Sequence, residues 1–233
     1  MERSVFLVSA LALLAAASPP PMKTVAGIGV PDTALANEAT DLAKAALPLE
    51  IFNHSLRTYL FAELVAKVKK IDHDAELVYV ASILHDTGMA QRYMSDRRPF
   101  EVDGAFVTTD LLERHGGSAD RKATAWDAVA LHDNGGIAAH KQPEVMLVSA
   151  GVGADFGAYL DLLTREQIVS VLAAAPRTGF IDVFLAASAA VAKRKPGACA
   201  HSFVADVGYR KVPGFTLPNF CDEVKDDPFA AYT

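Results

Sequence analysis

The stretch "HDAELVYVASILHD", His73 to Asp86, decides the fold of this chain. Its near-continuous apolar run predicts a helix that is buried on most sides and therefore central. The run ends in an adjacent pair, His85 and Asp86, with a threonine and a glycine behind it. Such a pair is costly to bury unless something compensates it. The rest of the sequence must therefore supply the groups that do so.

Helical patterns fill most of the chain. From about Glu50 to Lys70, apolar residues recur every four positions, as on one face of a helix. Alanine is abundant and runs of β-branched residues are rare, which favours helices over strands. Further helices are expected at about 30–47, 101–115, 118–136, 142–156, 164–176 and 178–197. The sequence predicts an all-α protein, a compact bundle of about seven or eight helices.

The pattern divides the chain into three parts. Residues 1–21 form a leader, and the helical domain covers 31–195. Residues 196–233 mix proline, glycine and aromatic residues without a period. This composition predicts an irregular C-terminal tail that packs on the surface of the domain.

The leader has the pattern of a secretory signal peptide. A charged start with Arg3 precedes an apolar run from Val5 to Ala17, and small residues then offer a cleavage site. We therefore expect a secreted or periplasmic protein after cleavage. If Met22 is the true start, the protein is cytoplasmic. The apolar run is too short to span a bilayer comfortably, so no stable membrane insertion is expected.

Composition limits the partners. The net charge is −6 and no basic stripe is present, which argues against nucleic acid and leaves a small molecule as the expected partner. The apolar helix faces also allow a homodimer. Cys199 and Cys221 both lie in the tail, and two cysteines alone do not decide whether they pair.

Polar residues recur on the inward faces of several predicted helices. His54, His85 and His132 each share a helix face with apolar residues, and Asp155 ends another helix. Taken singly, a buried histidine is usually hydrogen-bonded in the core, and an aspartate at a helix end is usually a cap. Together they indicate a metal site, because buried charge tends to be paired or to bind metal. Two imidazoles with the carboxylates of Asp86 and Asp155 suit zinc, iron or manganese.

These residues also carry a resemblance to a known family. The motifs "FNHSLR" (52–57), "ILHDTG" (83–88) and "AGVGADF" (150–156) resemble those of the HD superfamily of metal-dependent hydrolases. Three further motifs resemble its cyanamide hydratase-like branch, and the likeness extends over about 31–229. These are "FEVDGA" (100–105), "WDAVALHDNGGI" (126–137) and "HKQPEVMLVSAGV" (140–152).

The resemblance implies an all-α fold and one divalent metal ion, expected to be zinc, with iron or manganese as alternatives. It implies as ligands His54, His85, Asp86 and Asp155. In two-metal members of the superfamily, extra histidines hold a second ion.

Several other residues are candidates for the site. His115 has the right place in the chain order to hold a second ion, but it equally suits the cap of a helix C-terminus. His132 is expected to donate a proton or contact the substrate. His140 lies at the pocket mouth or in a loop. Glu101 and Asp103 either compensate a helix dipole or serve the pocket.

The expected reaction follows from the ligand set. A metal-bound water gives hydroxide near neutral pH, which would attack a small nitrile-type substrate and convert cyanamide to urea. His132, Glu101 or Thr87 would relay the proton to nitrogen. Arg57, one turn after His54, would pair with an acid in the pocket or with a substrate anion.

Two alternatives stay open. The first is a phosphohydrolase acting on a nucleotide or small phosphate ester, which needs cations near the metal. The sequence offers as candidates Arg57, Arg92, Arg97, Arg98 and Lys141. The second alternative is a non-catalytic helical module whose metal is structural and whose site has no open position for water.

Overall fold

The structure is a computed structural model, and it describes residues 21–223. The predicted leader at 1–21 lies, apart from Pro21, outside the described residues, and so does the end of the tail. Within the described range, no helix is both long and apolar enough to cross a membrane.

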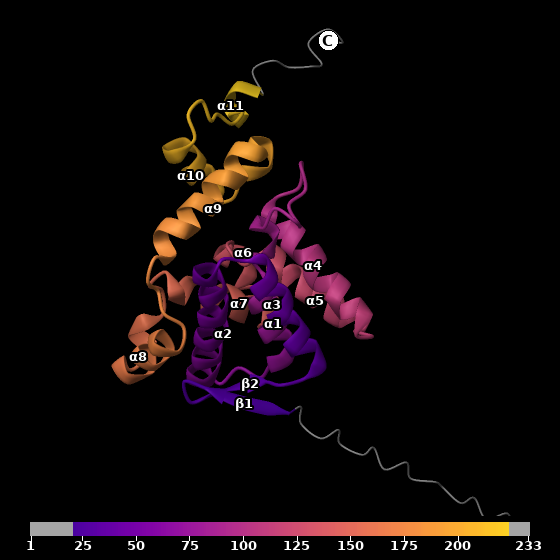
Figure 1. The fold of residues 1–233 in the computed structure, drawn as a ribbon, viewed down its shortest axis with the longest axis vertical. Helices are drawn as coiled ribbons and strands as arrows, with labels where there is room; N and C mark the ends of the chain where they lie inside the picture. The colour runs from indigo at the N-terminus through magenta and orange to yellow at the C-terminus, as the bar shows by residue number, and fades with distance from the viewer. Residues whose placement is uncertain (1–20, 224–233) are drawn as a thin grey trace, which may run out of the picture.

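The described chain is mainly helical, which confirms the predicted all-α class (Figure 1). The eight longest helices are α1 (Ala34–Ala46), α2 (Leu49–Lys69), α3 (Ala75–Leu84), α4 (Phe100–Arg114), α5 (Ala119–Ala130), α7 (Pro143–Asp155), α8 (Arg165–Ala174) and α9 (Phe180–Arg194). Shorter elements are η1 (Thr87–Met89), α6 (Gly135–Ala138), η2 (Leu160–Leu162), η3 (Pro196–Cys199), α10 (Val204–Lys211) and α11 (Phe220–Glu223).

A small hairpin precedes the helices. Strands β1 (Met22–Val25) and β2 (Ile28–Pro31) pair antiparallel. The two turn residues, Ala26 and Gly27, both have positive φ angles of 52° and 76°. Two-residue hairpin loops favour such angles because they match the twist of the strands. The sequence analysis did not predict this hairpin, since each strand is only four residues long.

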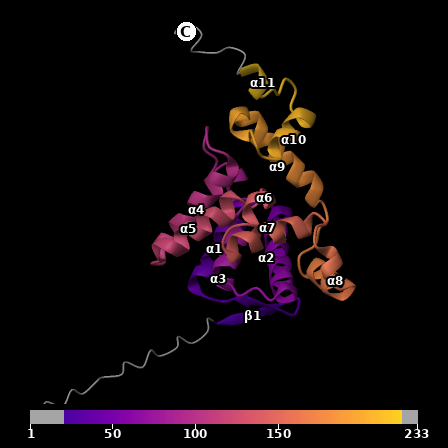
Figure 2. The same cartoon turned by 180° about the vertical axis from the view of Figure 1, so that it is seen from behind.

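The main core surrounds α3, as its apolar sequence predicted. Every residue from Leu77 to Leu84 is buried. Helices α2 and α7 cover one side of α3, and the α4–α5 pair lies beside it (Figures 1 and 2). The helix begins at an N-cap, Asp74, whose side chain accepts a hydrogen bond from the Leu77 N–H.

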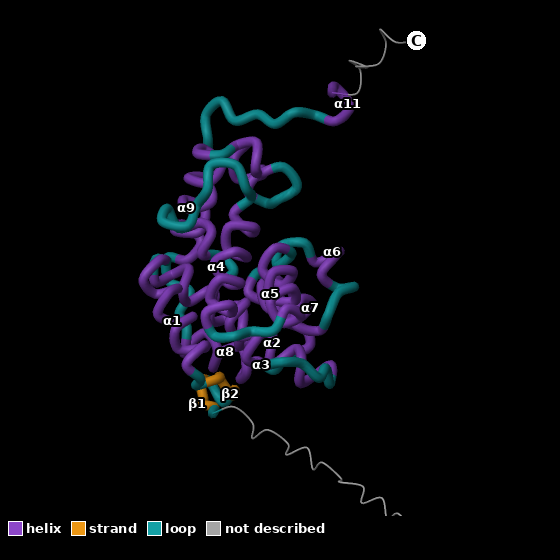
Figure 3. Tube along the Cα trace, turned by 90° about the vertical axis from the view of Figure 1, so that its right-hand side faces the viewer, coloured by secondary structure: helices purple, strands orange, loops and turns teal. Residues whose placement is uncertain are grey.

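A second, smaller core joins the tail to the domain. Phe180 and Phe184 of α9 pack here with Phe100 of α4 and with two tail residues, Val204 and Phe215. The tail is more regular than its composition predicted, because α10 lies against α9 and buries one apolar face. Figure 1 shows α10 and α11 at the opposite end of the molecule from the hairpin, and Figure 3 shows the same for α11. Both cysteines are free, Cys199 buried and Cys221 exposed.

Helices α2 and α7 approach each other very closely at Gly151. A Cβ atom built on Gly151 would lie 2.1 Å from the Thr58 carbonyl oxygen. One helical turn beyond this contact, His54 of α2 meets Asp155 of α7. The absence of a side chain at Gly151 therefore sets the spacing at which these two polar residues meet.

We predict that Gly151→Ala destabilises the fold while Gly153→Ala, on the same helix, does not. The alanine at 151 must push α7 away from α2, at a cost of about 1–3 kcal/mol. At Gly153 the nearest atom to an added Cβ is 3.5 Å away, so alanine fits there without a clash. Because alanine favours a helix over glycine by up to about 1 kcal/mol, Gly153→Ala should keep or raise the stability. Urea unfolding of the two variants measures this difference. Equal stabilities would contradict the close contact.

Candidate metal centre

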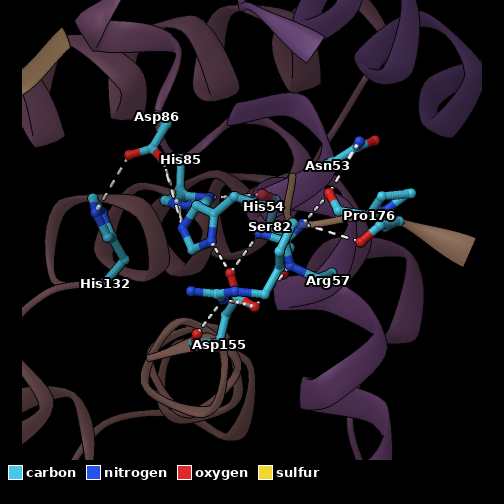
Figure 4. Close-up of polar contacts among 11 residues, drawn as sticks. Asn53, His54, Arg57, Ser82, His85, Asp86, His132, Asp155 and Pro176 are labelled. Atoms are coloured by element: carbon cyan, nitrogen blue, oxygen red, sulfur yellow. Dashed lines mark hydrogen bonds and ion pairs between the residues drawn. The ribbon is translucent and has the colours of Figure 1, made fainter. Parts of the chain in front are cut away.

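Four buried residues from three parts of the fold gather in one place (Figure 4). His54 lies on α2, His85 and Asp86 directly follow α3, and His132 follows the end of α5. Each side chain is at most 3% exposed. The chain turns sharply at Asp86 because α3 ends at Leu84 and the short η1 begins at Thr87.

The three histidine rings are each oriented by a hydrogen bond at Nδ1. In each ring Nδ1 faces an acceptor: the Asp155 carboxylate for His54, and the carbonyls of Ser82 and Val129 for His85 and His132, all at 2.7 Å. Each Nδ1 therefore carries the proton, which leaves the lone pair of a neutral ring on Nε2. Metal-binding histidines are usually held this way.

The Nε2 atoms converge on Asp86. Its Oδ2 lies 3.2 Å from Nε2 of His85 and 3.7 Å from Nε2 of His54, while Oδ1 lies 3.9 Å from Nε2 of His132. Neither oxygen of Asp86 has a hydrogen-bond partner among the described residues. The carboxylate is thus buried without the groups that normally satisfy one.

This geometry fits a divalent cation. One ligand atom from each of His54, His85 and Asp86 can be chosen so that all lie within 4.8 Å of one another. Nε2 of His54 and Nε2 of His85 face each other at 3.3 Å, which is unfavourable for two lone pairs unless a positive charge lies between them. Imidazole and carboxylate ligands suit zinc, iron and manganese, so these donors do not select one metal.

The pKa values of His85 and Asp86 also indicate that this place favours a positive charge. Burial opposes charging of His85, but the Asp86 carboxylate outweighs it and raises the pKa of His85. Burial likewise favours a neutral Asp86, yet His85 and His54 hold the pKa of Asp86 well below its usual range. A proton and a metal ion therefore compete for the same place, as in metal sites generally.

Asp155 lies on the other side of the His54 ring (Figure 4). It accepts hydrogen bonds from Nδ1 of His54 and from Arg57 at 2.7–2.8 Å, and a further one from Arg177. Burial raises the pKa of Asp155, but the bonds from His54 and Arg57 lower it to about 2. Asp155 therefore lies at Nδ1 of His54, while the group whose ligand atoms can share an ion consists of His54, His85 and Asp86. In this position Asp155 orients the His54 ring, and the ligand role expected from the sequence stays a prediction.

His132 also differs from its expected role as a proton donor. Burial and the nearby His85 lower the pKa of His132 to about 4, so the ring is neutral near pH 7. Its only proton is directed to the Val129 carbonyl. Nε2 is therefore an acceptor, available as a further ligand beside Asp86.

Glu101 lies in the first turn of α4, near Asp133. Its side chain is buried, and neither carboxylate oxygen has a hydrogen-bond partner among the described residues. Burial and the nearby Asp133 carboxylate raise the pKa of Glu101 to about 8. Glu101 is therefore protonated near pH 7. The sequence analysis did not select Asp133, although His132–Asp133 is a second His-Asp pair that could have drawn attention to it.

Two other predicted catalytic residues have structural contacts. The hydroxyl of Thr87 donates to the Leu84 carbonyl at 2.6 Å and so closes the end of α3. The guanidinium of Arg57 is fully buried and is held by Asp155 and by the carbonyls of Ala175 and Pro176. Neither side chain is free to relay a proton or to bind an anion.

The remaining candidates lie apart from the group. His115 caps α4 and pairs with Glu38 at 2.7 Å. His140 is exposed in the loop between α6 and α7. Asp103 is buried, but its carboxylate binds Lys195 and two groups of the 95–98 loop, Ser95 and Arg98. These contacts indicate structural roles for His115 and Asp103.

A pocket of about 360 Å³ adjoins the centre at His132. Its other polar lining residue is Asp133, and its walls are apolar side chains of α7, α9 and the tail. His132 thus faces Asp86 on one side and the pocket on the other. A small molecule in this pocket would lie beside the candidate metal ligands.

A helical domain with a buried His-His-Asp group that fits a divalent ion is the arrangement of a metal-dependent hydrolase. Residues 51–172 match the family model for the HD domain, and the chain belongs to this family. No curated protein matches the chain. The family and the site together indicate a metal-dependent hydrolase.

We predict that His85→Ala and Asp86→Asn each abolish metal binding. Either change removes one of the three groups that can share the ion. Elemental analysis of purified protein measures the metal per chain, with His115→Ala as a matched control outside the group. Full metal content in His85→Ala would show that the ligand assignment is incorrect.

We predict a different result for Asp155→Asn. This change leaves Arg57 buried without its counter-charge and should cost about 3–5 kcal/mol of stability. The double variant Arg57→Gln/Asp155→Asn removes both charges and should recover part of that loss in urea unfolding. Because Asp155 acts through His54, the double variant should still bind metal, about 10–100-fold more weakly. A folded double variant that binds no metal at saturation would make Asp155 a direct ligand.

Proposed function

We propose that this protein is a metal-dependent hydratase that adds water to a small, uncharged nitrile-type substrate. The observation that carries the proposal is the buried carboxylate of Asp86, which has no hydrogen bond and lies among three Nε2 atoms, next to a pocket that no lysine or arginine of the described residues lines. The motifs that resemble the cyanamide hydratase-like branch support the same reaction. Cyanamide would become urea, and a larger nitrile would become an amide.

His54, His85 and Asp86 would hold the ion, with His132 beside them. A bound divalent ion lowers the pKa of water and so supplies hydroxide near neutral pH. The protein keeps the three imidazoles neutral at Nε2 through their Nδ1 contacts. Burial of all four side chains keeps bulk water away from the reacting atoms.

Hydration of a nitrile also requires a proton for its nitrogen. Glu101 suits this role because it is buried, protonated near neutral pH and close to Asp133 at the pocket wall. A carboxyl that stays neutral at pH 7 can donate where His132 and Thr87 cannot. We therefore assign the proton transfer to Glu101.

The charges around the site favour an uncharged substrate over a phosphate ester. Among the described residues, no lysine or arginine lines the pocket. Arg57 is occupied by Asp155, Arg98 by Asp103, and Lys141 by Asp127. A phosphate bound in the pocket would thus meet Asp133 and would have the metal ion as its only cationic partner, whereas an uncharged nitrile needs no further cation.

We predict that the protein loaded with zinc, iron or manganese hydrates cyanamide or another nitrile. The assay measures urea or amide formation, beside hydrolysis of nucleotides and of p-nitrophenyl phosphate. Glu101→Gln should lower turnover by about 10²–10⁴-fold, the usual share of general acid catalysis, and keep its metal. Glu113→Gln, on the exposed face of the same helix, is the matched control.

Three results would contradict the proposal. Hydrolysis of phosphate esters without nitrile turnover would identify a phosphohydrolase. Metal binding without any turnover would identify a structural metal in a binding module. Full activity in Glu101→Gln would remove Glu101 from the reaction while leaving the hydratase assignment intact.

A further inference from the structure

We propose that the substrate carries an uncharged apolar body, larger than cyanamide, that fills the pocket between α7, α9 and the tail. For the reacting group, this inference rests on the proposed function. For the body of the substrate, it rests on the shape, lining and exposure of the pocket alone.

The size of the pocket exceeds the needs of cyanamide. Its volume of about 360 Å³ corresponds to roughly a dozen water molecules, at about 30 Å³ each. Pockets of this volume typically hold ligands of many atoms. Cyanamide has three non-hydrogen atoms and would leave most of the space to water against apolar walls. A ligand that covers those walls removes this unfavourable contact.

The walls are aromatic and aliphatic. Phe184 and Phe203 stack at 5.4 Å between ring centroids, and Phe156 meets Phe184 at 5.5 Å. Val152, Ile181, Leu185 and Val207 complete the apolar lining. Aromatic faces arranged in this way suit a flat ring or an alkyl chain.

Two of these side chains are partly open to solvent. Phe156 is 50% exposed and Ile181 is 48% exposed, and both line the pocket. The Phe156 ring also contacts the His54 ring edge-on, at 5.5 Å between centroids. Phe156 therefore extends from the solvent-exposed surface to the candidate metal centre. An apolar ligand would cover both side chains and place its reacting end near His132.

The charge of the pocket decides between kinds of apolar ligand. An anionic body would meet Asp133 without a lysine or arginine among the described lining residues. A cationic body is the competing case, because aromatic faces also attract cations. Among the described residues, seven apolar side chains line the pocket beside one carboxylate, that of Asp133, so most of the surface that a ligand body would cover is apolar. These observations favour an uncharged body.

The test compares phenylacetonitrile with analogues that carry a para-carboxylate or a para-trimethylammonium group, and with cyanamide. We expect kcat/KM for phenylacetonitrile to exceed that for cyanamide and for both charged analogues by at least about 10-fold, which is about 1.4 kcal/mol. Preference for the trimethylammonium compound would overturn the uncharged body in favour of a cation. Preference for cyanamide would overturn the inference altogether.

Variants of residues that line the pocket test whether the preference for phenylacetonitrile arises there. Val207→Trp fills the pocket from α10 and should lower kcat/KM for phenylacetonitrile at least about 10-fold more than it lowers kcat/KM for cyanamide. Val169→Trp, at an exposed position of α8, is the matched control and should change neither. If Val207→Trp does not fold, Leu185→Trp fills the same pocket from α9. Unchanged use of phenylacetonitrile in the folded variant would contradict the assignment.

A binding measurement separates the two proposals. Phenylacetamide, the expected product, should bind the wild-type protein in saturation-transfer NMR and bind Val207→Trp much more weakly, whether or not any nitrile is hydrated. Binding of this kind without turnover would support the apolar pocket and reject the hydratase. Cyanamide turnover without phenylacetamide binding would support the hydratase and reject the apolar body.

Discussion

The candidate site depends on the different surroundings of two buried carboxylates, those of Asp155 and Asp86. Asp155 is surrounded by cations and donors: Arg57, Arg177 and the Nδ1 proton of His54. Asp86 has only the Nε2 atoms of histidines around it and no hydrogen-bond partner within the described chain. A buried charge without compensation is costly, so Asp86 favours a cation beside it, either a protonated His85 or a metal ion. This asymmetry separates the carboxylate that supports the site from the one that can share an ion.

Close contacts between helices hold these two carboxylates and the histidines in place. The approach of α2 to α7 at Gly151 places His54 above Asp155, and α3 delivers His85 and Asp86 from the centre of the core. On another side, Gly88 lets the backbone of α4 press against the turn after Asp86: a Cβ atom there would lie 1.9 Å from the Phe100 carbonyl oxygen. Packing without side chains at two glycines thus fixes three polar groups to the precision that metal binding requires.

Much of this could be read from the sequence. The apolar run before His85 predicted the central helix, and helical spacing placed His54 and His132 on inward faces, as the structure shows. Helical spacing assigns a residue to a face, but it does not say which atom of a ring points where. Helical spacing therefore could not predict that Asp155 contacts Nδ1 of His54 rather than Nε2. The same holds for Thr87, whose hydroxyl closes a helix, and for α10, whose amphipathic turn is too short to stand out.

The family match includes the candidate metal-binding residues but ends before most of the residues that line the pocket. His54, His85, Asp86 and His132 fall within residues 51–172, whereas Ile181, Phe184, Phe203 and Val207 lie beyond it. Under the proposed function, the reacting groups lie in the earlier stretch and most of the substrate-binding surface lies in the later one. Substitutions at Leu185 or Val207 would then change which molecules bind, whereas Phe184 also packs against His54 and so belongs to both parts. Descendants of such a protein could acquire new substrates while the candidate metal-binding residues stay the same.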